Sequence, residues 1–231
     1  MSKKIKVLQR YRDANKAAHP DDEFNKLFGQ FSDGSGIKNM GGFRIRKSNH
    51  SGTVAFSFLI TNANEPEWPD RLDTTNSQFL YYGDKRGEYG RGNDLHNTAA
   101  KGNSLLRNTF FLLAKQERHK IAPFLLFKKV NEKNGVYMHF LGLAAPALSG
   151  VDPLSCLKAI WHQGMDGEFC MNYEAYFTIL DASEVAIQWL DDILQTGNFT
   201  ESSFCPWAWK FWVDSGSYRK LSFEDFLLSS C

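Results

Sequence analysis

Aromatic and acidic side chains gather in one short stretch of this chain. Trp68, Asp70 and Asp73 stand a few residues before an apolar and aromatic run, residues 79 to 82. Aromatic faces stack on flat rings, and carboxylates accept hydrogen bonds from ring amines. The combination predicts the edge of a pocket that holds a flat polar ring. A nucleobase swung out of duplex DNA is such a ring.

The net charge of +1 conceals an uneven distribution along the chain. Residues 85 to 130 hold ten Lys or Arg against three acids, whereas residues 131 to 231 hold five against thirteen. This pattern favours one phosphate-facing surface and one solvated or partner-facing surface. Ordinary charge scatter is the alternative, because blocks of sequence need not fold onto one face.

Length and composition predict a single globular domain of mixed α+β class. The chain has 231 residues, of which 42% are hydrophobic and 14% aromatic, enough for a substantial core. No apolar run approaches the roughly 20 residues that span a bilayer, and the first residues lack the pattern of a signal peptide. We therefore expect a cytoplasmic protein without a membrane partner.

Metal and cofactor chemistry have little support in the sequence. The cysteines all lie in the last third without a CxxC pair, and the histidines form neither HxH nor HxxxH. Pro-Asp pairs occur at 20–21 and 69–70, but no (D/E)xK motif follows at a useful distance, and no P-loop or GxSxG is present. We expect neither metal nor cofactor and no enzymatic activity, although paired carboxylates at Asp70 and Asp73, or at Asp191 and Asp192, remain an alternative.

The expected elements divide the chain into three parts. Residues 1–35 form a helical extension, residues 36–181 the core, and residues 182–231 a helical segment. Strands are expected around Arg44 and Arg46 and at 54–61, 79–82, 123–130, 136–144 and 174–181, with a hairpin turn at Asn134 and Gly135. Helices are expected at 21–31, from Gly102, and from Asp181 to Gly197. The Trp-rich segment 204–213 predicts a docked helix or, less simply, a stacking platform for single-stranded nucleic acid.

Several ordered motifs give the chain a family resemblance between about residues 40 and 220. They are WPDRLD, FLYYGDKRGEYGRGNDLHNTAAKGNSLL, PFLLF, FLGLAAP, Phe-x-x-Asn-Tyr, FTILD and W-x-x-WV-x-x-G-x-Y. Together they resemble the amino-terminal domain of AspBHI-type modification-dependent restriction endonucleases. Such domains are similar to the SRA fold, a curved β-barrel of the PUA-like class that flips 5-methylcytosine out of duplex DNA. The chain is thus expected to be an SRA-like DNA-binding domain without a nuclease domain.

The resemblance also implies roles for individual residues. The expected base pocket consists of Trp68, Asp70, Asp73, Tyr81 and Tyr82, with Trp68 and Tyr81 as stacking faces and one of the two acids accepting the cytosine amine. The expected contacts to the DNA backbone or grooves are Arg44, Arg46, Lys47, Lys85, Arg86, Arg91 and Asn103. The alternative is that Trp68 and Tyr81 are core residues and the basic side chains are solvated.

The expected partners are duplex DNA with a modified cytosine and a nuclease domain or effector outside this chain. Two other functions stay open at this point. One is a nuclease or hydrolase that acts on nucleic acid through an unrecognised acid pair. The other is a PUA-like reader of RNA or of another DNA modification, such as hydroxymethylcytosine or phosphorothioate.

Overall fold

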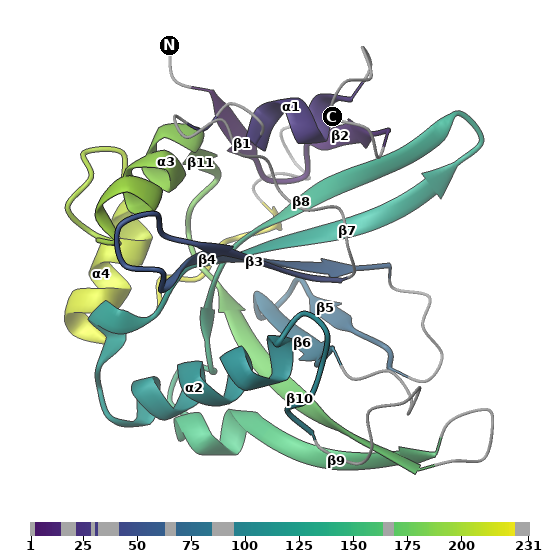
Figure 1. Cartoon of the computed structure of the whole chain (residues 1–231), viewed down its shortest axis with the longest axis vertical. Helices are drawn as coiled ribbons and strands as arrows, with labels where there is room; N and C mark the ends of the chain where they lie inside the picture. The colour runs from purple at the N-terminus through teal and green to yellow at the C-terminus, as the bar shows by residue number, and fades with distance from the viewer. Residues whose placement is uncertain are drawn as a thin grey trace.

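A nine-stranded mixed sheet forms the centre of the molecule in a computed structural model (Figure 1). The structure describes residues 3–14, 22–28, 31, 42–62, 68–84, 95–163 and 169–224. The strands of this sheet are β2 (Arg10–Asp13), β3 (Phe43–Lys47), β4 (Val54–Thr61), β5 (Arg71–Asp73), β6 (Gln78–Tyr82), β7 (Phe124–Glu132), β8 (Gly135–Pro146), β9 (Leu157–Gln163) and β10 (Phe169–Ile179). A separate pair joins β1 (Lys4–Lys6) to β11 (Glu184–Ala186). The described helices are α1 (Glu23–Phe28), α2 (Gly102–Ala114), α3 (Ile187–Thr196) and α4 (Trp207–Ser215), besides two short 3-10 turns.

The strand order of the main sheet is β3-β4-β7-β8-β10-β6-β5, with β2 beside β8 and β9 beside β10. Strands β4 and β7 run parallel, and every other pair in the described residues is antiparallel. Within the described residues the path stays open, since β3 and β5 end it and do not pair with each other. The mixed α/β class agrees with the sequence, whereas the closed curved barrel stays a prediction.

The amino-terminal segment corrects one expectation. The sequence predicts a helical extension over residues 1–35, but Ile5 lies in β1 and Tyr11 in β2. Ile5 is fully buried between exposed Lys4 and Lys6, which is the alternation of a strand whose one face is covered. Strand β1 pairs with β11, and β2 pairs with β8, so tertiary pairing overrides the local pattern. The short helix expected within 21–31 is present as α1.

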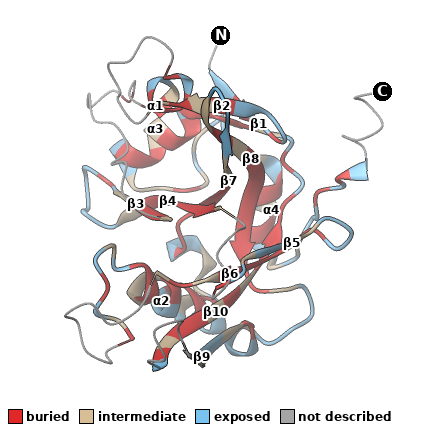
Figure 2. Cartoon of the chain, turned by 90° about the vertical axis from the view of Figure 1, so that its right-hand side faces the viewer, coloured by how far each residue is buried: buried red, intermediate tan, exposed pale blue. Residues whose placement is uncertain are grey.

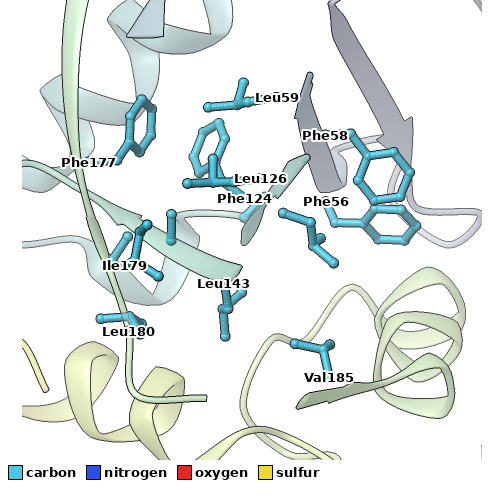
Figure 3. Close-up of a cluster of buried hydrophobic side chains, with 14 of the residues drawn as sticks. Phe56, Phe58, Leu59, Phe124, Leu126, Leu143, Phe177, Ile179, Leu180 and Val185 are labelled. Atoms are coloured by element: carbon cyan, nitrogen blue, oxygen red, sulfur yellow. The ribbon is translucent and has the colours of Figure 1, made fainter. Parts of the chain in front are cut away.

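Aromatic and aliphatic side chains from the strands and from the four described helices form the core. Figure 3 shows side chains of β4, including Phe56 and Phe58, near those of β7, β8 and β10. The ring of Phe58 also meets the rings of Phe28 and Phe24 from α1, with centroids 4.9 and 6.3 Å apart. Figure 2 shows that burial is concentrated along β4, β8 and β10. Strands β5 and β9 therefore lie at the edges of the sheet, outside the most buried strands.

The carboxyl-terminal helices agree with the sequence in type but not at every boundary. Helix α3 begins at Ile187 rather than near Asp181, because residues 184–186 pair with β1. It ends where Gly197 adopts a positive φ of 71°, the left-handed conformation that glycine accommodates. In α4, Trp209 and Trp212 are fully buried, so the docked-helix interpretation of this segment holds for these two rings. No helix in the described part of the chain is long and apolar enough to cross a bilayer.

Candidate nucleic-acid interface

The β5–β6 hairpin brings Trp68, Asp70 and Tyr82 together. The carboxylate Oδ1 of Asp70 accepts a hydrogen bond from the backbone N–H of Tyr82 at 2.8 Å. The rings of Trp68 and Tyr82 lie 5.6 Å apart at an angle of 53°. Three of the residues expected at the pocket thus form one cluster, with an acid fixed by the backbone beside two aromatic rings.

Strands β9 and β10 add two residues that the sequence did not reveal. The imidazole of His162 lies 4.8 Å from the Trp68 ring, between centroids. Glu174 stands opposite Tyr82 in the β6–β10 register. Burial raises the pKa of the Tyr82 hydroxyl, and the negative charge of Glu174 raises it further. The hydroxyl therefore stays protonated at neutral pH, able to donate a hydrogen bond. Only the strand pairing brings His162 and Glu174 here, so no local motif could have identified them.

Tyr81 occupies the opposite face of β6. Its side chain is 1% exposed, and its ring lies near those of Phe43 and Phe79. Its hydroxyl donates a hydrogen bond to the carbonyl oxygen of Gly42 at 3.1 Å. Neighbouring residues of a strand point to opposite sides of a sheet, so Tyr81 and Tyr82 cannot share one pocket. In this position Tyr81 is a core residue, the alternative that the sequence left open.

Asp73 serves the turn between β5 and β6. Its carboxylate accepts hydrogen bonds from the backbone N–H of Asn76 at 3.0 Å and from the Asn76 side-chain amide at 2.8 Å. These bonds lower the pKa of Asp73. Such contacts within a turn are typical of Asp in hairpin loops. Of the two acids considered for the base edge, only Asp70 lies beside the aromatic cluster.

The basic residues of β3 do not form one exposed row. Arg44 is 9% exposed, and its guanidinium lies 5.8 Å from the centroid of the Phe24 ring. Burial lowers the pKa of Arg44, while the charge of Asp13 opposes that shift. Arg44 is therefore enclosed beside Phe24 of α1 in this structure, and its contact with DNA stays a prediction. Arg46 is half-buried and Lys47 is exposed; Lys85, Arg86 and Arg91 lie outside the described residues.

Asn103 also differs from its expected role. It is fully buried, and its amide nitrogen donates to the carbonyl oxygen of Leu95 at 2.9 Å and to Oδ1 of Asn172 at 3.0 Å. Its own Oδ1 accepts from the backbone N–H of Asp84 at 3.0 Å. A side chain enclosed in this way is not exposed to a phosphate in this structure, and the contact between Asn103 and DNA stays a prediction. Asn103 instead joins Asp84 to Leu95, the described residues on either side of 85–94.

The same network explains a glycine and a helix start. A Cβ atom on Gly83 would lie 1.9 Å from Oδ1 of Asn103 and 2.4 Å from Oδ1 of Asn172, so only glycine fits. The carboxylate of Asp84 accepts from the backbone N–H groups of Gly102 and Asn103, each at 2.9 Å. Asp84 thereby satisfies two of the unpaired donors at the start of α2 and places a negative charge near its positive end.

Other possible ligand sites are poorly developed in the described residues. No group of three or more His, Cys, Asp or Glu side chains there could hold a metal ion. An open pocket of about 320 Å³ lies near β2 and α1, away from the Trp68 cluster. Its lining residues are Lys3, Gln9, Arg10, Tyr11, Glu23, Lys26 and Leu27.

Comparisons with known proteins identify the family of the chain. A family model described as restriction endonuclease AspBHI N-terminal matches residues 5–224. The solved DNA modification-dependent restriction endonuclease AspBHI is similar over 95% of this chain and 94% of its own, with 32% identity and a TM-score of 0.77. The DNA recognition domain of the cytosine modification-dependent restriction endonuclease LpnPI is similar over 95% and 92%, with 26% identity and a TM-score of 0.76.

A third solved structure supports the fold alone. The MspJI restriction endonuclease, in complex with a 27-mer oligonucleotide, has 17% identity and a TM-score of 0.72. The match covers 96% of this chain and 55% of the MspJI chain. A comparison with curated proteins found no match.

The fold and these matches define a DNA-recognition domain of the kind found in modification-dependent restriction endonucleases. Within that class, the chain belongs to the family of restriction endonuclease AspBHI N-terminal domains.

Proposed function

We propose that this domain binds duplex DNA containing 5-methylcytosine, flips the modified base into the Trp68 cluster, and supplies specificity to a restriction endonuclease. The main support for this proposal is the arrangement of Trp68 and Tyr82 around Asp70. The Asp70 carboxylate is held by a 2.8 Å hydrogen bond from the backbone N–H of Tyr82. The descriptions of AspBHI and LpnPI as modification-dependent enzymes support the same substrate class. The nuclease would be a separate domain or effector.

The aromatic cluster can offset the cost of flipping. Unstacking and unpairing a base costs a few kcal/mol, roughly the energy that stacking and several hydrogen bonds in a dry site return. A cytosine presents its exocyclic amine as a donor, and a carboxylate is its natural acceptor. In the proposal Asp70 accepts from this amine, while Trp68 and Tyr82 replace the pair of Trp68 and Tyr81 expected from sequence. Because only 3% of Trp68 is exposed, a neighbouring side chain must shift before a base can stack on it.

Discrimination of the methyl group requires close fit rather than one strong contact. A buried methyl group contributes only about 0.8 kcal/mol, which is less than a tenfold preference. Exposed Lys47 and the basic residues 85, 86 and 91 would supply sequence-independent attraction to phosphates. The affinity for DNA thus has two parts in this proposal. The basic side chains supply a salt-dependent part, and the Trp68 cluster supplies a part that depends on the modification.

The decisive experiment measures binding of this chain to matched duplexes with and without 5-methylcytosine. Fluorescence anisotropy at several salt concentrations should give tighter binding to the methylated duplex at each of them. Equal affinities throughout would rule out the proposal. Duplexes with hydroxymethylcytosine or phosphorothioate, and an RNA of the same sequence, form the other arms and would identify a different ligand.

Variants of the cluster separate the two parts of the affinity. Asp70→Ala and Trp68→Ala should remove the preference for methylated DNA while leaving salt-dependent binding to the unmodified duplex largely intact. Asp73→Ala is the matched control, since its carboxylate is engaged with Asn76 rather than with the aromatic rings. If Asp70→Ala retains the full preference, the assignment of the base acceptor is wrong.

A further inference from the structure

The outer part of strands β9 and β10 forms a two-stranded ribbon that extends beyond the main sheet. We define the ribbon as residues 157–163 paired with residues 169–175. Strand β6 pairs with β10 only from Glu174 onward, so within the described residues 169–173 have β9 as their one strand partner. Figure 1 shows the ribbon projecting past β6, on the side of the molecule away from α3 and α4. An isolated pair of strands is only marginally stable in water, so its side chains need other contacts.

The two faces of the ribbon differ in how far they are covered. His162 and Cys170 are opposite each other in the register and share one face, where His162 packs against Trp68. Trp161 and Phe169 belong to the other face, and each is 56% exposed. Strand alternation fixes this division, because successive residues point to opposite sides.

The uncovered face changes character along its length. Near the sheet, Tyr173 is buried, and its hydroxyl lies 2.9 Å from Nε2 of His96. Met171, opposite Trp161, is partly buried against the core. Farther out, Trp161 and Phe169 have little cover.

We propose that this ribbon enters a groove of duplex DNA beside the flipped base, with Trp161 and Phe169 packing against the exposed edges or faces of the neighbouring bases. The inference rests on the proposed function and extends it to a surface that the base pocket does not include. The occupant is DNA rather than another protein because the covered face of the same two strands carries His162, which contacts the base-pocket residue Trp68. One face of the ribbon thereby meets the flipped base while the other meets the duplex that the base has left.

The dimensions and chemistry of the ribbon fit this role. The major groove admits a two-stranded β-ribbon, and proteins that bend DNA insert apolar side chains between bases. Flipping removes one base from the stack and exposes the faces of its neighbours, which an aromatic ring can cover. A large aromatic side chain gains contact area there at little loss of conformational freedom.

The test compares Trp161→Ala with the unaltered chain on methylated and unmethylated duplexes that carry 2-aminopurine next to the target cytosine. We expect affinity for the methylated duplex to fall about tenfold, a typical loss for one stacking contact. The rise in 2-aminopurine fluorescence that accompanies flipping should shrink as well. Trp161→Phe should restore most of both signals, and Phe169→Ala should act in the same direction with a smaller effect.

Trp207→Ala is the matched control, because Trp207 is 61% exposed but lies on α4, away from the ribbon. It should bind like the unaltered chain, and circular dichroism should show both Trp variants folded. Unchanged affinity and fluorescence in Trp161→Ala would overturn the ribbon inference, as would a dimer in sedimentation that Trp161→Ala dissociates. The proposed function fails by a different result, namely the absence of any methyl preference in the unaltered chain.

Discussion

Two groups of tryptophan-centred side chains in this molecule have different neighbours. On α4, Trp209 and Trp212 lie 4.9 Å apart, and Trp209 also meets Trp189 of α3 at 6.1 Å; all three are fully buried. At the β5–β6 hairpin, Trp68 is almost as buried, and its ring neighbours are His162 and Tyr82. Trp212 also has a polar aromatic neighbour, Tyr218, at 6.1 Å. Depth of burial alone therefore does not separate the packing rings of α4 from the proposed binding ring Trp68. What distinguishes Trp68 is the carboxylate of Asp70, which the Tyr82 backbone holds near it.

The largest effect that this comparison predicts is the loss of stability in Trp209→Ala. The ring joins α3 to α4, so its removal leaves a cavity between two helices. We expect the free energy of unfolding to fall by about 3 to 5 kcal/mol, as measured by chemical denaturation. Trp209→Phe, which keeps most of the volume, should lose much less. At temperatures where it stays folded, Trp209→Ala should keep its preference for methylated DNA; a selective loss of that preference would show that the two regions are not independent.

A smaller loss of stability is expected from a substitution of Asn103, whose buried side chain makes hydrogen bonds rather than apolar contacts. Asn103→Ala leaves the part-buried N–H of Asp84 and the buried carbonyl oxygen of Leu95 without the Asn103 side chain as partner. Unpaired buried groups cost about 1 to 3 kcal/mol, which should appear as a lower midpoint of denaturation. Hydrogen exchange at the Asp84 amide should accelerate. Ser104→Ala is the control, because its hydroxyl makes one longer contact, 3.3 Å to the His96 carbonyl oxygen.

A stability of Asn103→Ala equal to that of the unaltered chain would mean that the network contributes nothing to the fold. The contact with DNA that the sequence suggested would then deserve a fresh test. Loss of phosphate-dependent affinity at unchanged stability would support that earlier assignment.

The sequence predicted those parts of the molecule whose signals are local. The run 54–61 became β4 without change of bounds, and the expected hairpin turn joins β7 to β8 at Lys133 and Asn134, one residue earlier than Asn134 and Gly135. The amino-terminal strands were missed because pairing partners far along the chain, β8 and β11, determine them. Local propensity carries no information on such partners.

Residues of the candidate site could likewise be predicted from sequence only where they are close to one another along the chain. Trp68 and Asp70 could be found because they are near Tyr82 in sequence, whereas His162 reaches Trp68 only through the pairing of β9 with β10. The choice of Tyr81 over Tyr82 depended on knowing which face of β6 points to the core, and residues 79 to 82 are all large and apolar or aromatic. A strand without clear alternation does not specify its faces.

The smallest effect concerns Asp73, and it sharpens the comparison between the two acids. Hydrogen bonds from Asn76 lower the pKa of Asp73 in the folded state. When folding lowers the pKa of a carboxylate, the charged group stabilises the fold at every pH above its pKa in the unfolded chain. This contribution is lost as the pH falls through its pKa in the folded protein. Asp73→Ala should therefore lower Tm near neutral pH by on the order of 1 °C, and the difference should shrink as the pH falls through and below the ordinary pKa of an aspartate, about 3.9.

Thermal unfolding across that pH range measures the effect, with Asp73→Asn as the variant that keeps an acceptor oxygen but no charge. Because the carboxylate closes a turn, Asp73→Ala should leave the preference for methylated DNA unchanged while Asp70→Ala removes it. The reverse result, with preference lost only in Asp73→Ala, would assign the base edge to the acid in the turn. It would also place the bound ring at the tip of the β5–β6 hairpin rather than beside Trp68, since the two carboxylates bind different parts of that hairpin.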